Sequence, residues 1–335
     1  MIQFMSYFLS IISPIRNEEK YIDKCLASLV NQDYDKQNYE ILVIDGVSTD
    51  KTREIVKQYE SNYDNIKLFD NPNKTVPYAL NIGIKHAIGD VIIRVDGHAV
   101  IEKDYLLQCV KYLKNTRAEC VGGVIESINE TYIGKAIALA MSSPFGVGNA
   151  RFRTSGEEGF VDCLAFGAYR REVFDKIGNF DEEFVRCQDD ELNYRLRKFG
   201  GKIFFTPKIK SYYYPRSNLK KLWRQYFQYG FWKIRVLQKH FKTMQPRQFV
   251  PPAFVFSLLT TGVLGVFSTR ALWLFLSIIL TYLVACFAVS LKISLKKGFE
   301  YLKILPIIFF MLHISYGLGF LFGLIRFLKY WKKSN

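Results

Sequence analysis

Three long apolar segments near the C-terminus constrain the fold of this chain more than any other feature. They cover residues 250–267, 271–291 and 304–325. A helix needs roughly 20 residues to cross about 30 Å of hydrocarbon, and each segment is close to that length. The first is the shortest and begins with Pro251 and Pro252. We therefore expect a membrane domain over residues 248–335 with about three hydrophobic helices.

Basic residues beside these segments predict their orientation. Residues 268–270 alone join the first two segments, which predicts a tight hairpin. The positive-inside rule places the basic stretches 233–247 and 292–303 in the cytoplasm. A third full span would then carry the basic tail after residue 325 outside, so either the third segment is re-entrant or interfacial, or the rule is overridden. We expect a multi-pass protein of the cell (inner) membrane with a cytoplasmic polar domain.

The net charge of +15 indicates an anionic partner. No zinc-finger, RNA-binding or homeodomain-like pattern is present, so we expect no nucleic acid. The basic residues gather between Lys202 and Arg247 and beside the apolar segments, which favours lipid headgroups or a phosphate-bearing substrate. The six cysteines show no C-x-x-C spacing and are expected to be reduced thiols. The N-terminus lacks the basic region and cleavage site of a signal peptide.

Ahead of the membrane domain, runs typical of buried strands alternate with helical patterns. We expect strands at residues 8–15, 39–44, 66–69, 91–95 and 121–125, with helices between them. This alternation predicts an α/β domain over residues 1–215, with a mostly parallel central sheet and helices on both faces. Neither a G-x-G-x-x-G fingerprint nor a Walker A lysine loop is present.

The pattern is less regular after the fifth strand. Residues 142–159 are expected to form a mobile loop over the site, and residues 161–170 a strand. A helix opens at Gln188 and ends near residue 199. Within the region 216–247, an aromatic and basic helix at 218–241 is interpreted as lying on the membrane surface. An ordinary docking helix is the alternative.

Polar side chains follow the predicted strands. Right-handed crossovers place the carboxyl ends of parallel strands at one edge, where open α/β sheets bind ligands. Pro14, Arg16, Asp45 and Asp96 would lie there. The run from Val91 to His98 ends in Asp-Gly-His, which could hold a divalent ion. Taken alone, this stretch supports a strand end with a polar turn about equally well.

Four motifs, in this order, resemble those of family 2 glycosyltransferases with a GT-A fold. They are Ser-Pro-Ile-Arg-Asn-Glu at 13–18, Val-Ile-Asp-Gly-Val-Ser-Thr-Asp at 43–50, Asp-Gly-His at 96–98 and Gln-Asp-Asp-Glu-Leu at 188–192. The segment 143–171 more narrowly resembles the ExoA-type succinoglycan-biosynthesis branch, whose members extend membrane-bound exopolysaccharide repeat units. The resemblance covers essentially the whole chain.

The resemblance implies a nucleoside-diphosphate-sugar donor, most often UDP-linked in this family. Asp45 matches the nucleotide-binding aspartate, and Pro14, Arg16 and Glu18 match the loop that lines the nucleotide pocket.

Asp96 and His98 match the D-x-D position, with His in place of the second Asp. They would hold Mg²⁺ or Mn²⁺ against the diphosphate, and the imidazole favours Mn²⁺ slightly. Asp96 would also contribute to donor binding. The departure from D-x-D leaves the number of direct protein ligands open.

For the acceptor side, the resemblance implies inversion with an aspartate base. Asp189 matches the aspartate of the E-D motif, with Gln188 in place of the glutamate, and Asp190 is the competing candidate. A carboxylate at a helix start is stabilised as an anion and can still accept a proton. The alternative is that these are ordinary first-turn carboxylates.

Further candidates concern acceptor binding. Arg151 and Arg153 could bind a lipid-linked diphosphate. Gln228 and Trp232 keep two positions of the Q-x-x-R-W motif of processive members, but Phe231 replaces its arginine. Trp232 could stack on an acceptor sugar or anchor the chain at the membrane interface.

Together these features predict an inverting, metal-dependent hexosyltransferase that adds one sugar to a polyprenyl-diphosphate saccharide in exopolysaccharide or capsule biosynthesis. Polysaccharide-assembly proteins are possible partners. A polyprenyl-phosphate sugar synthase is the nearest alternative. A non-catalytic membrane protein that binds nucleotide sugar or scaffolds an assembly is the alternative from another class.

Overall fold

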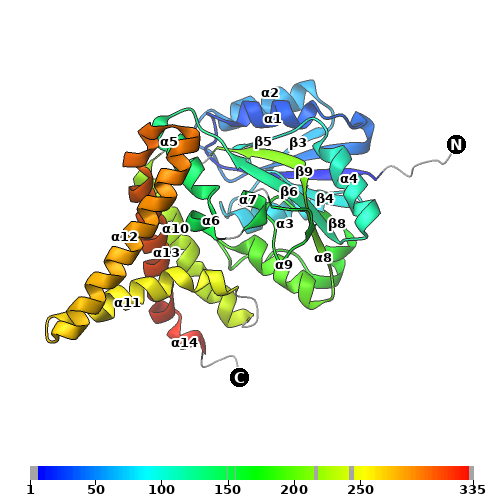
Figure 1. Ribbon diagram of the computed structural model, residues 1–335. Coiled ribbons are helices and arrows are strands. Elements are labelled where there is room, and N and C mark those ends of the chain that lie inside the picture. The colour runs from blue at the N-terminus through cyan, green and yellow to red at the C-terminus, as the bar shows by residue number, and fades with distance from the viewer. Residues whose placement is uncertain (1–6, 149, 155, 215–217, 241–244, 332–335) are drawn as a thin grey trace. The chain divides into compact units, whose positions relative to one another are not determined.

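The computed structural model describes residues 7–148, 150–154, 156–214, 218–240 and 245–331, which divide into two compact units (Figure 1). The first unit combines Met1–Glu126 with Ser155–Tyr214, and the second combines Ser127–Thr154 with Pro215–Asn335. Residues 127–154 therefore belong with the C-terminal helices, although both flanking stretches belong to the first unit. The domain boundaries expected at residues 215 and 247 stay predictions.

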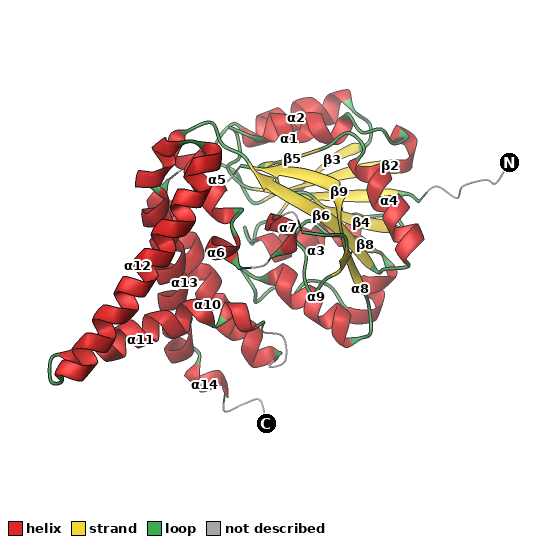
Figure 2. Cartoon of the chain, in the orientation of Figure 1, coloured by secondary structure: helices red, strands yellow, loops and turns green. Residues whose placement is uncertain are grey.

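A mixed sheet organises the first unit, with helices on both faces (Figure 2). Its parallel half runs in the order β3 (Ile66–Asp70), β2 (Tyr39–Asp45), β1 (Leu9–Ile15) and β4 (Val91–Arg94). Every residue of β1, β2 and β4 is buried. Near-continuous apolar runs of this kind are typical of parallel strands that are covered on both faces. The carboxyl ends of these strands meet at one edge.

The other half of the sheet is antiparallel. It continues from β4 through β8 (Ala168–Arg170), β6 (Cys120–Ser127) and β9 (Ile203–Tyr213) to β5 (Ala99–Ile101), and β7 (Gly159–Phe160) also pairs with β9. The predicted fold class is confirmed. The strand expected over 161–170 is wrong except for its last three residues. Phe166 has a φ of 56°, and a left-handed residue interrupts an extended run.

Helices of the first unit follow the predicted alternation. They are α1 (Ile22–Val30), α2 (Thr52–Asn62), α3 (Val76–His86), α4 (Tyr105–Thr116), α8 (Glu172–Ile177) and α9 (Gln188–Lys198), with a 3-10 turn η1 at Lys36–Asn38. α1 shows why these segments are helical. Its buried side chains Ile22, Leu26, Leu29 and Val30 recur at helical spacing, so one face packs inward.

Apart from Ser127 at the end of β6 and the connecting loops, the described residues of the second unit form helices. It contains α5 (Tyr132–Met141), α6 (Pro144–Val147), α7 (Arg151–Thr154), α10 (Leu219–Lys239), η3 (Pro246–Gln248), α11 (Val250–Gly265), α12 (Thr269–Lys297), η4 (Phe299–Lys303), α13 (Leu305–Arg326) and α14 (Leu328–Trp331). Helical stretches at Pro246–Gly265, Thr269–Lys297 and Leu305–Arg326 are long and apolar enough to cross a membrane. The region expected as a mobile loop, 142–159, instead contains α6 and α7.

Glycines bring α10 and α13 into backbone contact. A Cβ added at Gly319 would lie 2.0 Å from the Phe227 carbonyl oxygen, and one at Gly230 would lie 2.0 Å from the Tyr316 carbonyl oxygen. Gly323 faces the Phe231 carbonyl in the same way. Small residues four apart allow this close approach between apolar helices. One face of α10 therefore packs along α13. That the other faces of α10 lie at the membrane surface stays a prediction.

We predict that Gly319→Ala lowers the free energy of unfolding in detergent by about 1–3 kcal/mol, because overpacking forces two backbones apart. Gly262→Ala in α11 is the control, since its Cβ would meet only the Phe275 ring, at 3.3 Å. There the better helix propensity of alanine, about 1 kcal/mol, should offset any strain. Equal effects of the two substitutions on thermal unfolding would contradict the close packing of α10 on α13.

Candidate active site

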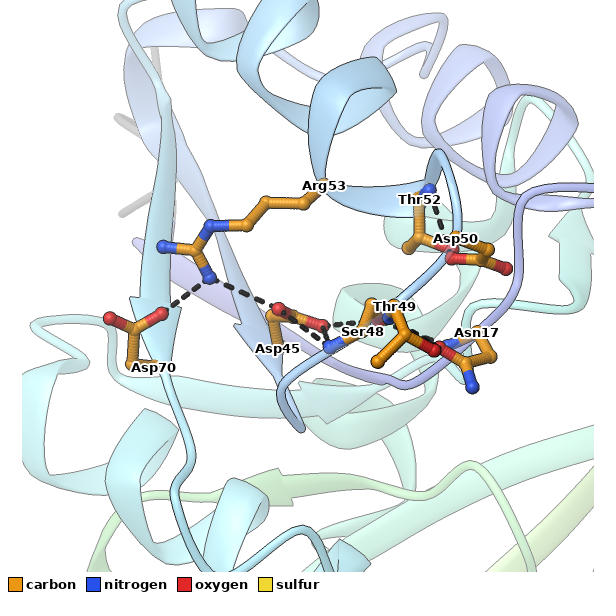
Figure 3. Close-up of polar contacts among 8 residues, drawn as sticks. All are labelled: Asn17, Asp45, Ser48, Thr49, Asp50, Thr52, Arg53 and Asp70. Carbon is orange, nitrogen blue, oxygen red and sulfur yellow. Dashed lines mark hydrogen bonds and ion pairs between the residues drawn. The ribbon is translucent and has the colours of Figure 1, made fainter.

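Hydrogen bonds connect the loops that follow β1 and β2 (Figure 3). The Asn17 N–H donates to Ser48 Oγ over 2.9 Å, and the Thr49 N–H donates to Asn17 Oδ1 over 2.8 Å. The next residue, Glu18, donates its N–H to Thr52 Oγ1 over 2.7 Å. These side chains replace the sheet partners that the backbone loses where the parallel strands end. The two loops therefore form one connected wall at the edge of the sheet.

Asp45 ends β2 and is completely buried. Its carboxylate accepts hydrogen bonds from Ser48 Oγ over 2.5 Å and from Arg53 Nη1 over 3.0 Å, and the same nitrogen lies 2.5 Å from Asp70 Oδ1 (Figure 3). A hollow of about 420 Å³ is lined by Asp45, Val47, Ser48, Arg53, Asp70 and Pro72. The predicted nucleotide-binding aspartate thus borders this hollow, with its carboxylate held by Ser48 and Arg53, and its role in nucleotide binding stays a prediction.

Pro14 and Arg16 stand at the end of β1. Pro14 pairs with Ile44 inside the sheet and is buried, whereas Arg16 is exposed. The Arg16 side chain packs on Gly46, where an added Cβ would lie 3.3 Å from Arg16 Cβ and Cδ. Of these two predicted residues, Arg16 is the one whose side chain is accessible to a ligand.

Several residues around this edge adopt left-handed backbone conformations without being glycine. Asn17 has a φ of 54°, Val47 of 58°, Phe166 of 56° and Cys187 of 64°. For a β-branched residue such as Val47 this conformation costs about 1–2 kcal/mol. Strain of this kind persists where surrounding structure imposes it, and it clusters at functional sites.

Arg94, at the end of β4, joins two of the predicted site aspartates. Its Nε and Nη2 donate to the two oxygens of Asp96 over 2.8 and 3.0 Å, and its Nη1 donates to Asp189 Oδ1 over 2.5 Å. Arg94 is not among the site residues predicted from the sequence. The available signal was an arginine inside a β-branched apolar run, because a charge buried in a strand requires a charged partner.

The shared arginine affects the two carboxylates differently. For Asp96, burial alone would raise the pKa, but the charges of Arg94, His98 and Arg186 outweigh it and lower the pKa below its ordinary value. For Asp189, burial is the largest effect and raises the pKa to about 6. Arg94 opposes this shift, while Asp96 and Asp190 add to it. Asp189 can therefore exchange a proton near neutral pH, whereas Asp96 stays ionised.

Asp190 has a different environment from its neighbour. Its Oδ1 accepts a hydrogen bond from the Cys163 thiol over 3.0 Å, and Cys163 Sγ in turn accepts from Asn193 Nδ2 over 3.3 Å. Glu191 forms two hydrogen bonds to Arg195, one turn along α9. The first-turn carboxylates of α9 thus have separate partners, and Asp189 is the one linked to Asp96 through Arg94.

His98 lies beside Glu18. His98 Nδ1 is 2.9 Å from Glu18 Oε1 without hydrogen-bond alignment, so this buried nitrogen has no hydrogen-bond partner. Gly97 allows the turn to approach β1, because an added Cβ would lie 2.6 Å from Ile15 Cγ2. Among the described residues, no three His, Cys, Asp or Glu side chains are grouped to hold a metal. The metal role of Asp96 and His98 stays a prediction. His98 Nδ1 is free of a hydrogen-bond partner within the described part of the chain, whereas both Asp96 oxygens already accept hydrogen bonds from Arg94.

The predicted acceptor residues all belong to the second unit. The side chain of Arg151 lies outside the described residues. Arg153 Nη1 is 3.4 Å from Ser127 Oγ, and its guanidinium lies over the Phe152 ring. Trp232 packs on Phe231 and Phe327, with ring centroids 5.6 and 6.0 Å away. Gln228 lies on the same helix, α10.

Comparisons with known proteins agree with this architecture. Residues 10–178 match the family model described as glycosyl transferase family 2. A dolichyl N-acetyl-alpha-D-glucosaminyl phosphate 3-beta-D-2,3-diacetamido-2,3-dideoxy-beta-D-glucuronosyltransferase of Methanococcus voltae is 34% identical over 95% of this chain and 98% of its own length. The succinoglycan biosynthesis protein ExoA of Rhizobium meliloti is 28% identical, over 95% of each chain.

A solved structure with a similar fold is the mannosyltransferase PcManGT from Pyrobaculum calidifontis, in complex with GDP-Man and Mn²⁺. It is 18% identical, with a TM-score of 0.60, covering 95% of this chain and 88% of its own. This likeness concerns the fold.

We predict that Arg94→Met lowers the free energy of unfolding by about 3 kcal/mol, because it leaves two largely buried carboxylates unpaired. Asp189→Asn should then cost less in the Arg94→Met background than in the original chain, since the two residues interact directly. Denaturant unfolding of the four variants in detergent measures this coupling. Additive effects would contradict the ion pair.

Proposed function

We propose that this chain, which belongs to glycosyl transferase family 2, transfers a single sugar from a nucleoside-diphosphate sugar to a lipid-linked saccharide. The glycosyltransferase activity follows from the family. The donor class, inversion and acceptor are the proposal. The observation that carries it is the Arg94 bridge, which connects the donor-side Asp96 to Asp189, a carboxylate with a pKa near neutrality.

In the proposed donor site, the nucleotide binds at the hollow beside Asp45. The Asp45 carboxylate would accept hydrogen bonds from the base or ribose, and the neighbouring wall would contribute Arg16 and Glu18, with Pro14 buried in β1 as part of the support of this loop. UDP as the nucleotide follows the family resemblance. Asp96 and His98 would hold a divalent cation, which supplies positive charge to the leaving diphosphate when it is bound.

In the proposed reaction, the acceptor hydroxyl oxygen forms a bond to the anomeric carbon as the bond from that carbon to the diphosphate oxygen breaks. The diphosphate leaves with the electron pair, and the hydroxyl proton passes to the Asp189 carboxylate. Attack from the face opposite the leaving group inverts the anomeric centre. Arg94 holds Asp189 in place, and Asp190 is held by Cys163.

The proposed acceptor carries a saccharide on a polyprenyl phosphate or diphosphate. The Methanococcus voltae relative is named for a dolichyl-linked N-acetylglucosaminyl phosphate, and the Rhizobium meliloti relative for succinoglycan biosynthesis. We assign the lipid phosphates to Arg151 and Arg153 and the sugar to Gln228 and Trp232. The polar domain would work on the cytoplasmic face of the cell membrane, within exopolysaccharide or capsule biosynthesis.

Asp189→Asn is expected to reduce transfer by about 10²–10⁴-fold, the usual contribution of a positioned general base. UDP binding, measured by calorimetry, should be retained. Asp190→Asn is the matched control and should keep most of the activity. Transfer is followed as nucleotide release and product mass with membrane lipid extract and a panel of nucleotide sugars. Normal turnover by Asp189→Asn would reject its role as the base.

The pH dependence of turnover gives an independent test. A base must be unprotonated, so kcat should be constant above the pKa of Asp189 and fall tenfold per pH unit below about pH 6. Asp190→Asn removes a nearby negative charge that raises this pKa, so the acid limb should move to lower pH. An acid limb that survives in Asp189→Asn would assign it to another group.

A further inference from the structure

Both ring nitrogens of a histidine in the third apolar helix have partners on other segments. His313 Nε2 lies 2.7 Å from the Phe145 carbonyl oxygen, and Nδ1 lies 3.0 Å from the Tyr282 hydroxyl. A carbonyl only accepts, so Nε2 carries a proton and donates to Phe145, while the Tyr282 hydroxyl can donate to Nδ1. The ring therefore connects α13 to α12 on one side and to α6 on the other.

The bond to α6 satisfies a backbone group that its own helix cannot. α6 is a four-residue helix, and the last four carbonyls of any helix lack partners within it. An apolar setting makes an unpaired carbonyl costly. The Phe145 ring is held as well, with centroids 5.1 Å from Phe309 and 5.0 Å from His313. The membrane-type helices thus fix both the backbone and the side chain of Phe145.

The neighbouring residues leave this segment little room to move. A Cβ on Gly146 would lie 2.1 Å from the Ala140 carbonyl oxygen, so the chain turns back directly onto α5. Gly148 has a φ of 68° and packs against the Arg247 side chain, where a Cβ would meet Cδ at 3.0 Å. α7 begins three residues later. Only residues 148–150 separate α6 from α7, so holding Phe145 limits where α7 can lie.

α7 carries Arg153, to which the proposed function assigns the phosphate of the lipid carrier. A second contact holds the other end of segment 127–154, since Arg153 Nη1 lies 3.4 Å from the Oγ of Ser127, the last residue of β6. The bond from His313 to the Tyr282 hydroxyl is sufficient to connect α13 to α12. The second and shorter bond of His313 connects α13 to the segment that precedes Arg153.

We propose that His313 is a positioning residue for the lipid-linked acceptor. Through the Phe145 carbonyl it holds α6, and so it sets where Arg153 meets the phosphate of the carrier. This inference rests on the acceptor role proposed for Arg153. It assigns to a residue of a candidate membrane span an effect on acceptor affinity that should not extend to the donor.

The test uses the full chain in phosphatidylcholine nanodiscs, with farnesyl diphosphate as a soluble prenyl-diphosphate probe and UDP as the donor probe. His313→Phe should raise the Kd for farnesyl diphosphate about tenfold and leave the Kd for UDP unchanged. Arg153→Gln should weaken farnesyl diphosphate binding similarly. His313→Phe should also accelerate tryptic cleavage after Arg153, detected by mass spectrometry.

Two variants separate positioning from a general loss of structure. His313→Gln can donate to Phe145 and accept from Tyr282, so it should restore most of the affinity and the protection from trypsin. Tyr282→Phe removes only the bond to α12 and should change the Kd for farnesyl diphosphate less than twofold. Failure of His313→Gln to recover either property, or equal losses in Tyr282→Phe and His313→Phe, would overturn the proposal.

The outcomes also distinguish this inference from the function on which it rests. If the original chain binds UDP but not farnesyl diphosphate, the acceptor role of Arg153 fails, and the inference fails with it. If the original chain binds both probes and His313→Phe changes neither affinity nor cleavage, His313 serves helix packing alone. In that case the proposed transfer reaction still stands.

Discussion

A single buried arginine organises the proposed reaction centre. Arg94 projects from the central strand β4, and its side chain is only 9% exposed. Such a charge is tolerable only with well-placed counter-charges, because desolvation otherwise exceeds the Coulombic gain. Asp96 supplies one from the same strand end, and Asp189 supplies the other from α9. The first turn of α9 is therefore tied to the edge of the sheet.

This arrangement also explains how neighbouring carboxylates acquire different properties. Asp96 accepts two hydrogen bonds from Arg94, one on each carboxylate oxygen, and stays ionised. Asp189 accepts only one hydrogen bond from Arg94, and burial and nearby negative charges raise its pKa. Asp190 lies against a thiol instead. Adjacent acidic residues of α9 thus have different partners, and Asp189 shares Arg94 with the ionised Asp96.

The second unit relies on another constraint, the close approach of backbones in an apolar setting. Gly230, Gly319 and Gly323 let α10 and α13 meet without intervening side chains. Residues 127–154 leave the sheet to join these helices, and α5 buries Ala136, Ile137, Ala140 and Met141 in the same apolar cluster as α13. Segment 127–154 is thus part of the helical unit. Through it, α13 contacts the segment that carries Arg153, a residue proposed to bind the acceptor.

The sequence by itself determined the features that depend on local pattern. Largely apolar runs specified β1, β2, β4 and the three candidate spans, and the alternation with helices put Asp45 and Asp96 at one sheet edge. Tertiary structure alone decided that β8 enters antiparallel beside β4, that residues 142–154 join the C-terminal helices, and that Arg94 bridges Asp96 to Asp189. These features depend on contacts between residues far apart in the chain, such as the 95 positions that separate Arg94 from Asp189. Periodicity reports which face of a segment is buried, but it carries no information about which distant group will lie against that face.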